Sequence, residues 1–194
     1  MFLSDRTGDP NLFMRDLSSG REWQLSDNRD RILKSYVYFT GSPYRGLGMA
    51  SPTLDAESGT VYYIQGREIH LTRPGGERQL LATLPEGQMT AYTHVSVDGT
   101  RLCVPTVDAR ALDGDHRLRG HPTYGVARRM RRENLCSYLR VYRTSDGSEL
   151  ACEPVPQAWV THVQFSPVNP DWILYNHEWG RQAGVRRMWL WDGR

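Results

Sequence analysis

The sequence predicts an all-β protein made of β-propeller blades, each a sheet of four antiparallel strands. Short runs rich in Val, Ile, Tyr, Leu and Trp alternate with Gly, Pro, Asp and Ser, a pattern typical of short strands joined by tight turns. Helical periodicity is scarce along the 194 residues. One strand–turn–strand plan also recurs at intervals close to the length of a propeller blade.

The repeats have a common order of parts. Each begins with a strand that has a small or polar start, continues into a turn that contains Asp or Pro, and returns as a more apolar strand. The apolar strands are expected at residues 61–64, 101–104 and 172–175. Asp98-Gly99, Asp146-Gly147 and Gly75-Gly76 supply the positive φ that tight hairpin turns require. Because a single sheet cannot cover both of its faces, neighbouring blades are expected to cover them.

This plan divides the chain into blade units of approximately 1–30, 44–86, 90–156 and 159–194, the third interrupted by an insertion at 108–133. About two blades are complete and two are partial, since the first unit begins inside a blade and the last has no fourth strand. We therefore expect a piece of a larger propeller, a partial β-propeller over 1–194. Open strand edges at the two partial blades favour self-association.

Composition and charge exclude several classes of protein. The 24 basic residues nearly balance the 22 acidic ones, which argues against a strongly basic nucleic-acid binder. No run of 18 apolar residues predicts a membrane span, and the polar N-terminus does not resemble a signal peptide, so a cytoplasmic location is expected. The three cysteines are far apart without a CxxC pair, which favours buried or half-buried free thiols over a zinc site.

The insertion at 108–133 has a composition of its own. Five arginines fall between Arg117 and Arg131, and the absence of Gly and Pro after Val126 predicts a short helix in the second half. The insertion is interpreted either as a loop over the central channel that binds an anion or as a solvated surface excursion. His116 and His121 are a weak candidate pair of metal ligands.

Two segments carry a resemblance to known families. The run Ser-Asp-Arg-Thr-Gly-Asp-Pro-Asn-Leu at 4–12 looks like the repeats of TolB-type propellers. The second segment is more specific. It comprises Trp-Val-Thr-His-Val-Gln-Phe-Ser-Pro at 159–167, Asn-His-Glu-Trp-Gly at 176–180 and Arg-Arg-Met-Trp-Leu at 186–190. These stretches resemble an internal segment of the oligogalacturonate lyase family, seven-bladed propellers of bacterial pectin catabolism.

The resemblance implies a chemistry and a set of site residues. The family cleaves short galacturonate oligomers by β-elimination, so the expected partner is an anionic oligosaccharide. On the family pattern Arg187 is the catalytic cation opposite the uronate carboxylate, a role that suits the forked guanidinium. His177, Glu178 and His162 are the expected substrate-binding residues. A divalent, manganese-type metal ion is also implied, but the family's metal ligands and general base fall beyond Arg194, so no metal ligand is assigned here.

The residues leave other interpretations open. Arg187 also fits a surface ion pair, and His94 and His162 occupy equivalent repeat positions that fit a structural role. The competing functions are a non-catalytic TolB-like propeller module that binds a ligand or protein partner, and a truncated fragment without activity. Because Arg187 supplies a carboxylate partner but no base, the 194-residue chain alone is not expected to be a competent lyase.

Overall fold

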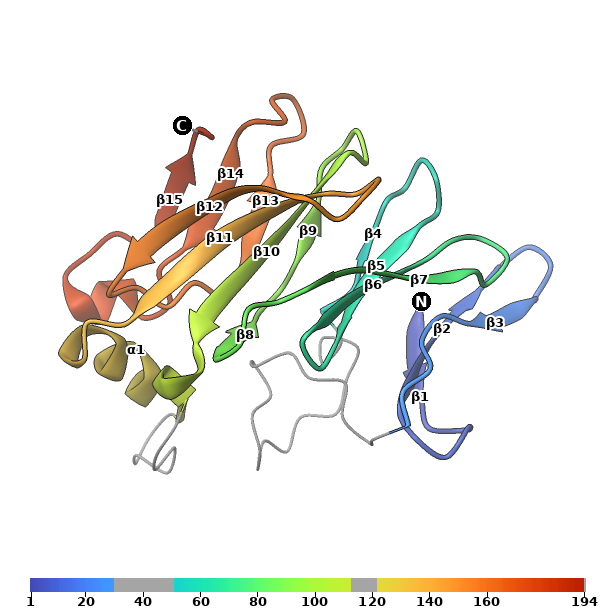
Figure 1. The fold of residues 1–194 in the computed structure, drawn as a ribbon, viewed down its shortest axis with the longest axis horizontal. Helices are drawn as coiled ribbons and strands as arrows, with labels where there is room; N and C mark the ends of the chain where they lie inside the picture. The colour runs from blue at the N-terminus through green and yellow to red at the C-terminus, as the bar shows by residue number, and fades with distance from the viewer. Residues whose placement is uncertain (30–50, 113–121, 194) are drawn as a thin grey trace.

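The computed structural model describes residues 1–29, 51–112 and 122–193, and it confirms the predicted all-β fold class. Four antiparallel sheets follow one another across the molecule from the N-terminal to the C-terminal end (Figure 1). The hairpin turns at one end of the sheets lie opposite the end that carries the single α-helix of the described residues (Figure 1). This arrangement of stacked, separate sheets is that of propeller blades.

The first two sheets come from simple meanders. The first contains β1 (Phe2–Ser4), β2 (Asn11–Arg15) and β3 (Glu22–Gln24) in that order. The second contains β4 (Thr53–Leu54), β5 (Val61–Gln65), β6 (Glu68–Thr72) and β7 (Arg78–Thr83). The turn between β6 and β7 contains Gly75 and Gly76, whose φ values of 100° and 91° are those that the sequence predicted for glycine.

The third sheet differs from the repeat plan at its inner edge. Its strands are β8 (Gln88–Thr90), β9 (His94–Val95), β10 (Arg101–Asp108), β11 (Cys136–Arg143) and β12 (Glu149–Pro156). Both β8 and β9 pair with β10, so two short pieces replace the single strand expected before Asp98. Pro105 lies in β10 between the two pairings, and since proline has no N–H to donate, the ladder is interrupted there.

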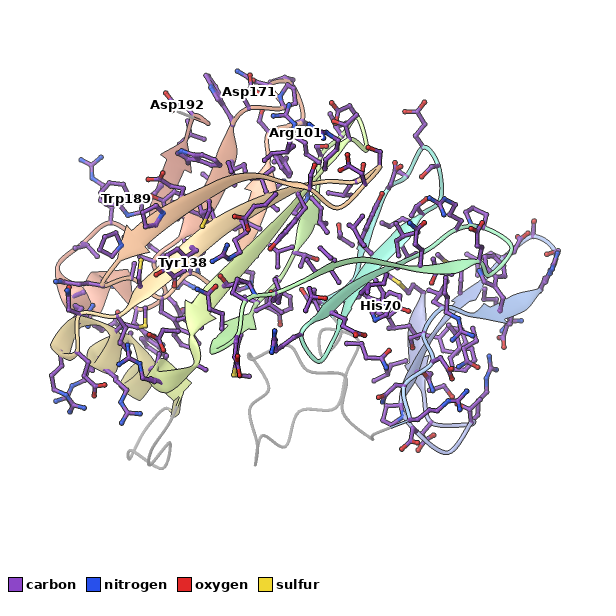
Figure 2. The ribbon with its side chains drawn as sticks, in the orientation of Figure 1. His70, Arg101, Tyr138, Asp171, Trp189 and Asp192 are labelled. Carbon is purple, nitrogen blue, oxygen red and sulfur yellow. The ribbon has the colours of Figure 1, made fainter. Side chains whose placement is uncertain are left out.

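The fourth sheet contains β13 (Val163–Phe165), β14 (Ile173–Asn176) and β15 (Met188–Trp191) in that order. An ion pair of 2.8 Å between Arg101 at the start of β10 and Asp171 before β14 joins it to the third sheet (Figure 2). A backbone bridge between Tyr92 and His162 links the inner edges of the same two sheets.

The insertion forms a helix that packs on the core. The 3₁₀ turn η3 (Ala109–Leu112) comes before the insertion helix α1 (Pro122–Arg132). Residues 113–121 between them, which include His116 and His121, lie outside the described residues. The predicted short helix is therefore confirmed. Val126, Ala127 and Met130 are buried against Trp159 and neighbouring side chains. The interpretation of the whole insertion as a solvated excursion was wrong for α1, because one face of this helix belongs to the core.

The remaining core lies between the sheets, as the propeller plan requires. One cluster joins the first two sheets through Leu12 and Tyr63, and a second joins the second and third through Tyr62 and Leu102. A third cluster joins the third and fourth sheets and includes Cys103, which is fully buried. All three cysteines are free, but Cys152 is exposed rather than buried as expected. No helix in the described residues is long and apolar enough to span a membrane.

Candidate active site

The predicted site residues come together where β14, β15 and the start of β13 meet. Glu178 follows β14, Arg187 precedes β15, and His162 directly precedes β13. The backbone N–H of His177 donates to the carbonyl oxygen of Arg187 at 2.7 Å, which closes the loop between β14 and β15. The short 3₁₀ turn η4 (Gly180–Ala183) fills this loop. Residues that are 25 positions apart in sequence thus share one end of the fourth sheet.

Arg187 makes a bifurcated hydrogen bond to the Glu178 carboxylate through one nitrogen. Its Nη2 donates to Oε1 at 3.0 Å and to Oε2 at 3.3 Å. The arginine side chain is 59% exposed and the glutamate side chain 16% exposed, so the pair lies at the surface with its cation outward. Among the described residues nothing accepts a hydrogen bond from Nε or Nη1 of Arg187. These donors are available to an anionic ligand.

Glu178 is itself held by two buried polar side chains. Thr161 donates from Oγ1 to Oε2 at 3.0 Å, and Asn176 donates from Nδ2 to the same oxygen at 2.9 Å. Thr161 and Asn176 are 4% and 3% exposed, so water competes little for these bonds. Glu178 therefore has a fixed position and in turn orients the guanidinium of Arg187.

His162 belongs to the same group of hydrogen bonds. Its Nδ1 lies 2.7 Å from Oγ1 of Thr161, and its ring centroid lies 4.7 Å from that of Tyr92 on the neighbouring sheet. Burial of part of the ring lowers the pKa of His162, and the nearby Glu178 carboxylate opposes this shift only in part. The imidazole is therefore neutral at pH 7.

His177 occupies a different environment. Its ring stacks on Trp189 with 5.2 Å between centroids and contacts Tyr175 at 5.8 Å (Trp189 is labelled on β15 in Figure 2). Burial lowers the pKa of His177. Its Nε2 is buried and has no hydrogen-bond partner within the described part of the chain. A buried polar atom without a partner is costly, so this nitrogen is a candidate for contact with a ligand.

A pocket of about 130 Å³ lies beside this group and is partly walled by the insertion helix. Its lining includes His177 and Glu178, Ala127 and Arg131 of α1, and Trp159. Sequence reasoning did not assign Arg131 or Trp159 to the site. The cluster of arginines in the insertion was the signal that pointed towards Arg131.

His94, the repeat counterpart of His162, does not join the site. Its Nδ1 accepts a hydrogen bond from the backbone N–H of Phe165 at 3.3 Å, which ties β9 to β13. Two histidines at equivalent repeat positions thus have different surroundings: His94 lies between two strands, and His162 lies in the polar group with Glu178.

The described residues do not fit a manganese-type ion. No three His, Cys, Asp or Glu side chains within residues 1–29, 51–112 and 122–193 are grouped closely enough to hold a metal. Glu178, the acid of the predicted site, already accepts hydrogen bonds from Arg187, Thr161 and Asn176. No metal-dependent step is therefore derived from these residues.

Comparison with solved structures shows the fold of this chain. It superposes over its full length on an oligogalacturonate lyase in complex with manganese, with a TM-score of 0.70 and 15% identity, covering 46% of that chain. It matches the oligogalacturonate lyase from Vibrio parahaemolyticus with a TM-score of 0.71 and 15% identity, again over 100% of this chain and 47% of that one. An acylaminoacyl peptidase from Pyrococcus horikoshii is similar at a TM-score of 0.53 and 10% identity, over 99% of this chain and 28% of that chain.

At these identities the likeness shows a propeller-like fold and no more. The chain spans slightly less than half the length of the two lyases. No protein-family model matches the sequence, and no curated protein matches it. The resemblance expected from residues 159–190 is therefore supported at the level of the fold, and the enzyme class that it suggests is a coarse one.

Proposed function

We propose that this chain binds acidic oligosaccharides of the galacturonate class at Arg187, as a segment of an oligogalacturonate lyase-like propeller. The observation that carries the proposal is the state of Arg187, which is oriented by Glu178 through Nη2 alone and keeps Nε and Nη1 available at the surface. Nε and Nη1 are donors suited to a carboxylate. The likeness of the fold to two oligogalacturonate lyases supports the choice of ligand class.

The chemistry of β-elimination explains why such an arginine is useful. Removal of the proton beside the uronate carboxylate places negative charge on that group, and a preorganised cation stabilises this charge without having to move. Glu178 has its oxygens occupied, and a carboxylate would repel an anionic sugar. We assign it the role of positioning Arg187 rather than touching the substrate. Nε2 of His177 and the guanidinium of Arg131 are the further groups available to sugar hydroxyls and carboxylates.

A second candidate is binding without turnover. The observation that favours it is that Glu178, the acid of the site, is held by Arg187, Thr161 and Asn176 and so is not free to take up a proton from a substrate. The two candidates share the same ligand and differ in the product. Incubation of the purified chain with trigalacturonate, with and without added manganese, separates them through the ultraviolet absorbance of an unsaturated product. We expect binding with little or no turnover, because general-base help is worth about 10²–10⁴ in rate and no base has been assigned.

Replacement of Arg187 by alanine tests the binding site directly. Loss of a charge-assisted hydrogen bond costs about 1.5–3 kcal/mol, so the affinity for trigalacturonate should fall about ten- to a hundredfold in isothermal titration calorimetry. Because this side chain is largely exposed, the melting temperature should stay nearly unchanged. Arg143→Ala is the matched control, since Arg143 is 48% exposed and also pairs with an acid, Asp146, but lies at the end of β11, just before the β11–β12 turn. Equal affinity of the Arg187→Ala variant and the wild-type chain would refute the proposal.

A further inference from the structure

Four polar side chains form one hydrogen-bonded group in which each proton can be assigned: Thr161, His162, Asn176 and Glu178. Oδ1 of Asn176 lies 2.9 Å from the backbone N–H of Thr161 and 2.9 Å from that of His162. Backbone N–H groups can only donate, so this atom of Asn176 must be the amide oxygen. The amide orientation of Asn176 is therefore fixed by the backbone.

The two protons on Nδ2 of Asn176 are then accounted for. One is donated to Oγ1 of Thr161 at 2.7 Å and the other to Oε2 of Glu178 at 2.9 Å. The Thr161 hydroxyl has used one lone pair in this way and keeps one proton and one lone pair. Its two remaining neighbours are Oε2 of Glu178 at 3.0 Å and Nδ1 of His162 at 2.7 Å.

Only one arrangement satisfies all of these atoms. An ionised carboxylate can only accept, so the Thr161 proton goes to Glu178. The remaining lone pair of the hydroxyl must then receive a proton, and Nδ1 of His162 must be the donor. If the hydroxyl pointed at Nδ1 instead, two oxygen lone pairs would face each other at 3.0 Å, which is repulsive in this buried position.

We propose that Thr161 is a positioning residue that holds neutral His162 as the Nδ1–H tautomer, and that Nε2 of His162 is thereby a hydrogen-bond acceptor for a hydroxyl of the bound sugar acid. The site thus offers a cation and an acceptor at the two ends of one hydrogen-bonded chain, Arg187–Glu178–Thr161–His162. This inference rests on the proposed function for the identity of the ligand, but the tautomer does not.

The ligand chemistry that follows is specific. Arg187 recognises the carboxylate, and Nε2 of His162 requires a donor, which a sugar hydroxyl provides. Nε2 makes no hydrogen bond to any residue that the structure describes, and His162 is exposed in part, so the acceptor is free to be used. A ring that carries a carboxylate and hydroxyl groups should therefore bind more tightly than a ring that carries a carboxylate alone.

The tautomer is tested first, without any ligand. A long-range ¹⁵N–¹H correlation spectrum of the full chain should show Nδ1 of His162 protonated and Nε2 unprotonated at neutral pH. Thr161→Val keeps the shape of the side chain but removes the hydroxyl, and should shift His162 towards the Nε2–H form. Thr161→Ser restores the hydroxyl and should restore the Nδ1–H signature. An Nε2–H tautomer in the wild-type chain would overturn the proposal even if no variant folds.

The acceptor role is tested with two ligands of matched charge and ring size, galacturonate and cyclohexanecarboxylate. A neutral hydrogen bond contributes about 0.5–1.5 kcal/mol, so the preference for galacturonate should fall about two- to tenfold in Thr161→Val and recover in Thr161→Ser. Arg187→Ala should weaken both ligands alike. An unchanged preference in Thr161→Val would refute the acceptor role. Failure of both ligands to bind the wild-type chain would instead refute the proposed function and the acceptor role with it, while the tautomer is still decided by the spectrum.

Discussion

Asn176 and Thr161 show that the candidate site depends on buried residues behind the exposed ones. Neither side chain is more than 4% exposed, yet together they fix Glu178 and, through it, Arg187. Arg187 and His162 each contribute a group to the surface, but their orientation is set by this inner pair. A catalytic or binding geometry of this kind needs such support, because an unsupported long side chain has many rotamers.

His94 provides a prediction about pH at the level of one residue. Burial lowers the pKa of His94 below the ordinary value of about 6.5. The unfolded chain therefore binds more protons than the folded chain in the window below 6.5, and the free energy of unfolding falls as the pH drops through that window. Protonation also removes the acceptor for the N–H of Phe165.

His94→Asn tests this account, since Oδ1 of asparagine can accept the same hydrogen bond without titrating. The melting temperature of the wild-type chain should fall between pH 7.5 and 5.5, and the variant should show a smaller fall. It should not lose the pH dependence entirely, because burial also lowers the pKa values of His162 and His177. Identical pH profiles for the variant and the wild-type chain would contradict the prediction.

Among the secondary-structure elements, the β11–β12 turn makes a close contact with the neighbouring blade. Gly147 in the β11–β12 turn has a φ of 73°, and a Cβ atom there would lie 1.9 Å from the carbonyl oxygen of Leu81 in β7 of the neighbouring sheet. Gly20 in the β2–β3 turn has nearly the same φ, 72°, but open space around it. The two glycines thus form a matched pair that differs mainly in this contact.

We predict unequal costs for the two substitutions to alanine. Gly20→Ala should destabilise the chain by about 1–2 kcal/mol, the cost of the left-handed conformation for a residue with a Cβ. Gly147→Ala should cost about 1–3 kcal/mol more, because the backbone of one blade must move away from the other. Urea unfolding of the two variants measures the difference. Equal losses would show that the β11–β12 turn does not press on β7.

The strands were predictable because apolar runs and Asp-Gly turns are local signals. The split inner strand was not, since it depends on Pro105 lying opposite residues about 14 positions earlier in the chain. The sequence predicted that α1 is a helix, but its burial against Trp159 depends on the tertiary fold and could not be predicted from local signals.

For the site, Arg187, His177, Glu178 and His162 were named from their resemblance to a family. Thr161, Asn176 and Arg131 were missed, because polar residues acquire such roles only when distant segments meet.

On the scale of the whole molecule, the two outermost sheets have different outer faces. On the first sheet the guanidinium of Arg6 lies 3.9 Å from the ring centroid of Phe13 and pairs with Glu22 at 2.6 Å, so charge covers the aromatic surface. On the fourth sheet Leu174 pairs with Leu190 across β14 and β15, and the two side chains are 38% and 52% exposed. Exposed apolar faces of this kind mark interaction surfaces.

The difference predicts how the 194-residue chain associates with itself. Because side chains alternate along a strand, Ile173 and Trp191 face the third sheet while Leu174 and Leu190 face away from it. Burial of a leucine contributes about 1.5–3 kcal/mol, so Leu190→Lys should weaken self-association about tenfold or more in sedimentation equilibrium. Leu17→Lys is the control, since Leu17 is 93% exposed but lies in a turn away from this face. Self-association that is equally strong in Leu190→Lys and in the wild-type chain would mean that the outer face of the fourth sheet is not the contact surface.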